Sequence, residues 1–140
     1  MTNQPATDKP AGPPQTFTVS HPRDDDFAEG GLRPYARYRD LGFAKATGGA
    51  AVAHVIRFVP PCTDEVRQWH THAIEFQMVY VLKGSITTEM EGQAPITMRA
   101  GSSWIQPPGI RHRVVDYSDD CEVLEVVLPA EFDTAMCAAP

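Results

Sequence analysis

Two histidines, His70 and His72, stand one residue apart, and together they have the spacing of a metal-chelating pair. On a β-strand this spacing places both side chains on one face, because successive side chains alternate between faces. Two imidazole groups on one face can chelate a divalent metal with little rearrangement, and imidazole suits Zn, Cu, Fe and Ni. A third ligand must come from elsewhere, and His112, which follows the Pro-Pro-Gly turn at 107–109, is the natural candidate.

The other two histidines point less clearly to a metal. His21 is interpreted as a surface residue of a polar lead-in segment. His54 stands in the otherwise apolar sequence AVAHVIRF, where it is either a buried, hydrogen-bonded residue or part of a cavity lining. The His70–His72 pair by itself leaves a metal site and ordinary packing equally open.

Short strands must position these histidines. From residue 32 onward, segments rich in β-branched and aromatic residues alternate with Gly, Pro and Asp turns, and helical periodicity is almost absent. Many short strands at this spacing predict an all-β fold, an antiparallel sandwich or barrel. Residues 65–72 lead into the strongest strand signal, EFQMVYVL at 75–82. The predicted strands span residues 35–41, 51–59, 75–82, 85–90, 94–99, 103–106, 111–117 and 122–128.

The 140 residues suit a single domain. Residues 1–31 are predicted to be a flexible N-terminal arm, because the first 16 are rich in Pro, Thr and Gln and nearly lack bulky apolar side chains. Residues 32–130 are predicted to form the β-barrel. Residues 131–140 are a short C-terminal tail, with one helical turn expected across 129–136.

The spacing around the paired histidines resembles the first motif of the cupin superfamily. That motif is His-x-His, three or four residues, Glu, six residues and Gly. This chain has His70-Thr71-His72, four residues, Gln77, six residues and Gly84. A carboxylate is therefore replaced by a neutral amide at one position of an otherwise matching pattern.

A second segment resembles the second cupin motif, which is Gly, five residues, Pro-x-Gly, two residues, His, three residues and Asn. This chain has Gly101, the turn at 107–109, His112 and Asp116 at those positions. The resemblance covers roughly residues 35–128 and is typical of small single-domain cupins. It implies an antiparallel jelly-roll β-barrel, often paired into homodimers, with a divalent metal near one mouth.

The resemblance implies a metal site made of His70, His72, Gln77 and His112. An amide oxygen is a weak ligand, so Gln77 is either a weak fourth ligand or a residue that hydrogen-bonds a ligand or a bound water. A β-bulge would instead bring Glu75 to the metal. Loss of the carboxylate leaves one more positive charge on the complex and more positions for substrate or O2.

Three-His cupins that resemble this arrangement include dioxygenases of the cysteine and diketone-cleaving types, which use Fe(II). This resemblance therefore implies a small-molecule dioxygenase with Fe(II), while Zn, Mn and Ni stay open. A non-redox isomerase or lyase is an alternative, and so is a non-catalytic protein that binds or senses a small ligand. Whether the chain is an enzyme at all is left open, because fold does not determine function.

Charge and composition bear on partners and location. The chain has 12 Lys and Arg against 18 Asp and Glu, a net charge of −6, which argues against nucleic acid as a partner. No apolar run is long enough to cross a membrane, and the N-terminus lacks the apolar core of a signal peptide. Three scattered cysteines suit a reducing compartment, so a cytoplasmic location is predicted. Residues 78–82 are apolar on both faces, which favours a homodimer, as the cupin resemblance also implies.

Overall fold

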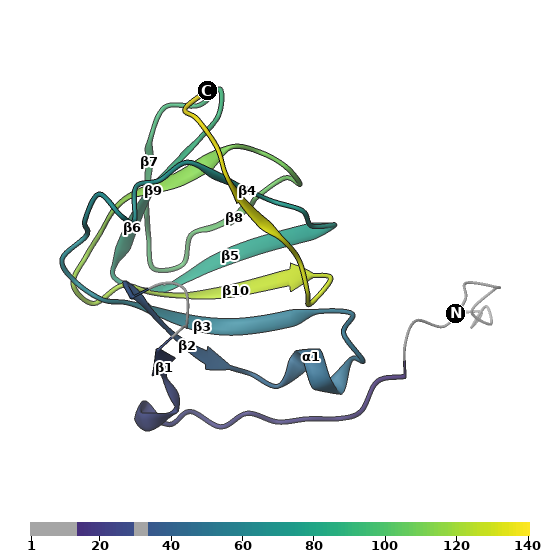
Figure 1. Cartoon of the computed structure of the whole chain (residues 1–140). Helices are drawn as coiled ribbons and strands as arrows, with labels where there is room; N and C mark the ends of the chain where they lie inside the picture. Colours follow the sequence, from purple (N-terminus) through teal and green to yellow (C-terminus); the bar gives the residue numbers. More distant parts are fainter. Residues whose placement is uncertain (1–13, 30–33) are drawn as a thin grey trace, which may run out of the picture.

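The computed structural model describes residues 14–29 and 34–140, and nearly all of its regular structure is antiparallel β-sheet (Figure 1). One sheet has the strand order β1-β2-β3-β10-β5-β8 and the other β11-β4-β9-β6-β7. The first comprises β1 (Ala28–Glu29), β2 (Ala36–Asp40), β3 (Val52–Phe58), β5 (Phe76–Lys83), β8 (Ser103–Ile105) and β10 (Glu122–Leu128). The second comprises β4 (His70–His72), β6 (Ser85–Met90), β7 (Ile96–Arg99), β9 (His112–Tyr117) and β11 (Thr134–Met136). This is the all-β jelly-roll architecture that the strand pattern and the motif resemblance predict.

The predicted strands are confirmed with small shifts at their ends. Strands β6 and β10 span the predicted residues 85–90 and 122–128. The other predicted strands begin or end within two residues of the expected positions. In the segment 65–72, only His70–His72 forms a strand. Among residues 14–29 and 34–140, helix is confined to a short 3-10 turn, η1 (Asp24–Asp26), and one helical turn, α1 (Phe43–Ala46). No helix in the described part of the chain has the length and apolar character needed to span a membrane.

The helical turn expected across 129–136 is wrong, because residues 134–136 form strand β11 instead. Its three residues pair with β4, and Thr134 lies opposite His72. The backbone N–H of Ala73 donates to Asp133 at 2.9 Å, and that of Cys137 donates to Trp69 at 3.0 Å. An exposed strand edge offers a row of unpaired backbone groups, and pairing with it overrides a weak local preference for helix.

The flexible arm predicted for residues 1–31 falls largely outside the described residues, since 1–13 and 30–33 are not described. Of the described part, residues 14–23 carry no regular structure and are exposed. The backbone N–H of Thr16 donates to Ala46 at 2.8 Å, and β1 pairs with β2. The described part of the arm is thus attached to the first sheet.

The inward side chains change character along the strands, and this change separates the core from the cavity. On β5 the inward row is Gln77, Val79 and Val81, of which Val81 is completely buried. On the neighbouring β10, Val123 lies opposite Val81 and belongs to the same apolar cluster. The larger hydrophobic cluster therefore lies at the Val81 end of β5, polar side chains begin at Gln77, and a smaller cluster of Val52, Ile74 and Val127 lies at the Gln77 end.

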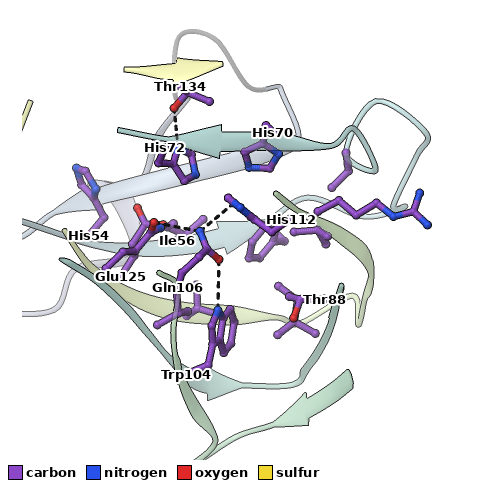
Figure 2. A pocket seen from close by; sticks show the side chains of 18 of the residues that line it. His54, Ile56, His70, His72, Thr88, Trp104, Gln106, His112, Glu125 and Thr134 are labelled. Atoms are coloured by element: carbon purple, nitrogen blue, oxygen red, sulfur yellow. Dashed lines mark hydrogen bonds between the residues drawn. The ribbon is translucent and has the colours of Figure 1, made fainter. Parts of the chain in front are cut away.

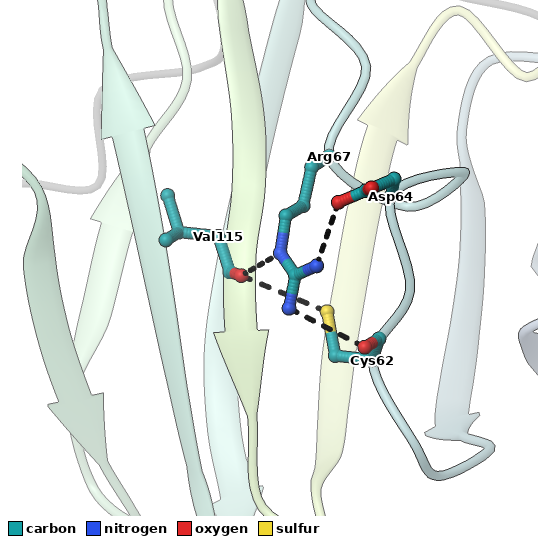
Figure 3. Close-up of polar contacts among 4 residues, drawn as sticks. All are labelled: Cys62, Asp64, Arg67 and Val115. Atoms are coloured by element: carbon teal, nitrogen blue, oxygen red, sulfur yellow. Dashed lines mark hydrogen bonds and ion pairs between the residues drawn. The ribbon is translucent and has the colours of Figure 1, made fainter.

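The loop that leads from β3 into β4 is fastened to β9 by Arg67 (Figure 3). Its Nε donates to the carbonyl oxygen of Val115 at 2.8 Å, and its two terminal nitrogens donate to Asp64 and to the carbonyl oxygen of Cys62. The hydroxyl of Tyr117 also donates to Val59 at 2.6 Å, and burial raises its pKa to about 12, so it stays a donor. These bonds hold the approach to β4, the strand that carries His70.

We expect Gly84→Ala to be markedly more destabilising than Gly92→Ala. Both glycines have positive φ, 69° and 80°, so both substitutions share the backbone strain of the left-handed region. A Cβ at Gly84 would also meet the side chains of Ser118 and Asp120 and lie 3.1 Å from Cys121 Cα, whereas nothing lies within 4 Å at Gly92. The extra loss in free energy of unfolding should be about 2 kcal/mol, measured by urea denaturation. Equal losses would contradict the tight packing at Gly84.

Candidate metal centre

The three predicted histidines meet inside the molecule, on the second sheet (Figure 2). His70 and His72 occupy alternate positions of β4 and both face inward, while Thr71 between them does not. His112 begins β9 and lies directly opposite His70 in the antiparallel register. Directly opposite residues on one face have side chains within contact distance, which brings the third imidazole to the pair. The ring centroids of His70 and His112 are 4.2 Å apart, and each side chain is at least nine-tenths buried.

Hydrogen bonds define which nitrogen of each histidine is available to a ligand. Nδ1 of His70 lies 2.9 Å from the carbonyl oxygen of Gln68, and Nδ1 of His112 lies 2.9 Å from that of Ile110. A carbonyl oxygen only accepts, so both Nδ1 atoms carry a proton, and in the neutral imidazole Nε2 then presents a lone pair. Nδ1 of His72 lies 2.7 Å from the hydroxyl of Thr134, which can accept in the same way. Tying Nδ1 and leaving Nε2 to the metal is the usual arrangement of ligating histidines.

An amide network from the first sheet faces the histidines. Nε2 of Gln106 lies 3.0 Å from Oε1 of Gln77 and 2.9 Å from Nε2 of His112. Nε2 of Gln77 donates to the carboxylate of Glu125 at 3.0 Å, and the indole N–H of Trp104 contacts Oε1 of Gln106 at 3.4 Å. Gln77 is only 2% exposed, so its amide is held on both sides by protein atoms.

A cavity of about 310 Å³ lies between these groups, within the size range of small-molecule sites. The histidines line one part of it, and Gln77, Gln106 and Glu125 line another. The remaining wall is mainly apolar and aromatic, and it includes Tyr35, Tyr38, Ile56, Phe58, Val79, Trp104 and Phe132. The site is therefore a small, mostly apolar pocket with a few convergent polar groups.

The sequence of residues 59–127 matches the family model of the cupin domain. This range contains both His-x-His and the Pro-Pro-Gly turn with His112, and the fold around them is the expected jelly roll. Residues 59–127 therefore form a cupin domain. A comparison with curated protein sequences found no match.

Solved structures of other cupins are similar to the chain in fold. KdgF from Halomonas sp. is 21% identical with a TM-score of 0.57, over 70% of this chain and 83% of that one. The DMSP lyase DddQ from Ruegeria pomeroyi DSS-3 is 20% identical with a TM-score of 0.53, over 62% and 43%. Salicylate 1,2-dioxygenase from Pseudoaminobacter salicylatoxidans in complex with gentisate is 9% identical with a TM-score of 0.60, over 75% and 30%. At these identities the likeness concerns the cupin fold alone.

The residues considered as ligands on sequence grounds lie in different places. Gln77 faces the cavity, whereas Glu75 is exposed, precedes β5 and is not part of the cavity wall. His54 lines the cavity, and His21 is exposed on the described part of the arm. The strand is regular at this point, so the bulge that would bring Glu75 inward is not seen.

Three residues of the cupin site were not singled out in the sequence: Gln106, Glu125 and Thr134. Glu125 had a visible signal, because it is a lone carboxylate at an inward position of the apolar strand EVLEVVL. Gln106 directly precedes the Pro-Pro-Gly turn, which gave it no distinguishing feature. Thr134 reaches His72 only because β11 pairs with β4, and no pattern in the sequence indicates that pairing.

The donor set fits a divalent metal. One ligand atom from each of His70, His72 and His112 lies within 4.8 Å of the others, and in the described ranges 14–29 and 34–140 this is the one such group. Three neutral imidazoles suit Fe, Zn, Ni and Cu better than Mg or Ca, which prefer oxygen ligands. Open positions would remain beside them, a feature typical of catalytic rather than structural sites.

We expect Thr134→Val to weaken metal binding by about 10-fold to 100-fold, because it removes the partner that orients His72. Thr134→Ser keeps a hydroxyl at that position and should bind metal nearly as well as the unmodified protein. The measurement is competition with a chelator of known affinity, after thermal unfolding has shown that both variants fold. Equal affinities for the two variants would contradict a role for this hydroxyl.

Proposed function

We propose that this cupin is a metal-dependent enzyme that acts on a small polar molecule inside the cavity between the sheets. His70, His72 and His112 would hold one divalent ion through their Nε2 atoms, and the ion would replace the Gln106 amide as the partner of Nε2 of His112. Gln77 would lie beside the ion as a weak ligand or hydrogen-bonding partner. The convergence of three histidines whose Nδ1 atoms all have a hydrogen-bond partner is the observation that carries this proposal.

The proposed reaction is an oxygen-dependent one with Fe(II), as in a dioxygenase. Bound at three neutral histidines, Fe(II) supplies a Lewis acid and a redox centre with positions for both substrate and O2. The protein's own groups would orient the substrate, since the amides of Gln106 and Gln77 offer hydrogen bonds and the aromatic wall excludes water. The salicylate 1,2-dioxygenase of similar fold supports this proposal, because a fold of this kind is compatible with such chemistry.

A second candidate is a non-redox isomerase or lyase, and the position of Glu125 favours it. Its carboxylate lies in the cavity wall rather than within the histidine group. A carboxylate beside the substrate but off the metal is a group that could move a proton in an elimination or isomerisation. The lyase of similar fold is consistent with this alternative.

Metal reconstitution tests the proposed function. Protein stripped by a chelator and reloaded anaerobically with Fe(II), Zn, Mn or Ni should take up about one ion per chain, measured by elemental analysis. Oxygen consumption is then measured with panels of thiols, diketones and hydroxy acids. We expect uptake of O2 with the Fe(II) protein and none with the Zn protein.

The control variants are His72→Ala and His21→Ala. The first should lose the metal while the protein keeps its thermal unfolding temperature in metal-free buffer, and the second, at an exposed site, should change neither. Conversion without O2 consumption, supported equally by Zn, would favour the lyase or isomerase. Stoichiometric metal with binding but no turnover of any panel member would indicate a binding protein, and failure to bind metal would reject the proposal.

We also propose that the outer face of β5 and β8 is covered by a second copy of the chain. Met78 lies opposite Ile105 on these two strands, and the outward residues Phe76, Tyr80 and Leu82 continue the apolar face. A symmetric dimer buries the same patch on both subunits, so one continuous apolar patch is sufficient for it.

Light scattering of two matched variants tests this dimer. Ile105→Lys, at a position 64% exposed on β8, should shift the protein from dimer to monomer at micromolar concentration. Ile96→Lys, at a position 52% exposed on β7 of the other sheet, should leave the dimer intact. A monomeric unmodified protein would reject the proposal.

A further inference from the structure

The buried amide of Gln77 has two possible orientations, and the groups around it select one. A side-chain amide has an oxygen that accepts and an NH2 group that donates, and the correct orientation follows from the partners on each side. On one side of Gln77 is the carboxylate of Glu125, and on the other is the amide of Gln106. These two partners decide which of the two atoms is presented to the histidines.

The groups at the two ends of the network, Trp104 and Glu125, determine the orientation of the two amides between them. The indole N–H of Trp104 only donates, so it requires the oxygen of Gln106 and turns the NH2 group of Gln106 toward Gln77 and His112. That NH2 group requires the oxygen of Gln77. At the far end, the carboxylate of Glu125 accepts from the NH2 group of Gln77 at 3.0 Å.

Both ends of the network therefore turn the Gln77 oxygen toward Gln106, the residue that also contacts His112. Oε1 of Gln77 and Nε2 of His112 are each within 3.0 Å of the same nitrogen, Nε2 of Gln106. The opposite orientation would present an NH2 group, which cannot bind a metal ion or accept a hydrogen bond from a metal-bound water. The orientation matters because Gln77 stands where the related motif has a carboxylate.

We propose that Glu125 is a positioning residue, which holds the amide of Gln77 so that its oxygen faces the three histidines. The first motif has no carboxylate at position 77 in this chain. A carboxylate is present instead at Glu125 on β10, and it acts through the amide of Gln77. Gln77 presents a neutral oxygen, and Glu125 fixes the orientation of the amide that carries it. This inference rests on the metal site of the proposed function.

Exchanging the two side chains tests the proposal. Gln77→Glu alone places two carboxylates at hydrogen-bond distance with no donor between them, and their repulsion opposes an ordered ligand. The double variant Gln77→Glu with Glu125→Gln restores an amide donor to a carboxylate acceptor, with the polarity reversed. It should bind metal at least about 10-fold more tightly than Gln77→Glu alone, because an oriented carboxylate is a stronger ligand than an unsupported one.

Glu125→Gln alone should lower metal affinity by about 10-fold, because an amide at position 125 can accept or donate and only the contact with Gln106 then orients the Gln77 amide. Glu122→Gln is the matched control, since it makes the same change on the same strand at a residue that pairs with Arg57 and does not line the cavity. It should leave metal affinity unchanged. Glu125→Asp, which keeps the acceptor, should recover affinity relative to Glu125→Gln.

Affinities are measured with Co(II) by chelator competition, and the visible absorption of the bound Co(II) reports whether its coordination changes. Thermal unfolding of the metal-free variants shows that they fold; if Gln77→Glu does not, the comparison of Glu125→Gln, Glu125→Asp and Glu122→Gln decides. Equal affinity in these three variants, or tighter binding by Gln77→Glu than by the exchanged pair, would overturn the positioning role. If the metal affinities follow the predicted order but the protein turns over no substrate, the positioning role of Glu125 is upheld and the proposed enzyme function is rejected. An unmodified protein that binds no metal would reject both.

Discussion

The antiparallel pairing of β4 with β9 is the contact on which the site depends, because it places His70 directly opposite His112. β4 has only three residues, and a strand of this length has little stability of its own. It lies between β9 and β11, and the loop before it is fastened to β9 by Arg67. The position of two of the three histidines is therefore maintained by the neighbours of β4 rather than by β4 itself.

The two sheets contribute different chemistry to the cavity. The second sheet supplies imidazole nitrogens, and the first supplies amides and a carboxylate. Buried polar groups are costly unless each finds a partner, and the bonds from Trp104 through Gln106 and Gln77 to Glu125 meet this requirement. The apolar core around Val81 and Val123 lies further along the same strands, so the polar cluster does not interrupt it.

Much of this molecule could be predicted from alternation and spacing. Residues 85–90 and 122–128 form the expected strands, and the spacing within two motifs correctly predicts that His70, His72 and His112 converge. The contribution of β11 could not be predicted, since Thr134 is 62 residues from His72 and its pairing depends on the exposed edge of β4. Glu125 was visible as an inward carboxylate in an apolar strand, but its partner lies on another strand, and sequence periodicity does not show which side chains touch between strands.

Because of strand β11, the metal site can be completed only late in the synthesis of the chain. The residues of β11 follow those of every other described strand, and so they leave the ribosome last among them. Until then His72 lacks the hydroxyl of Thr134 and β4 lacks one of its two neighbours. A domain generally folds as a unit during synthesis. A nascent chain therefore carries all three histidines before it can hold them in their final geometry, and the centre is completed only when synthesis has passed residue 136.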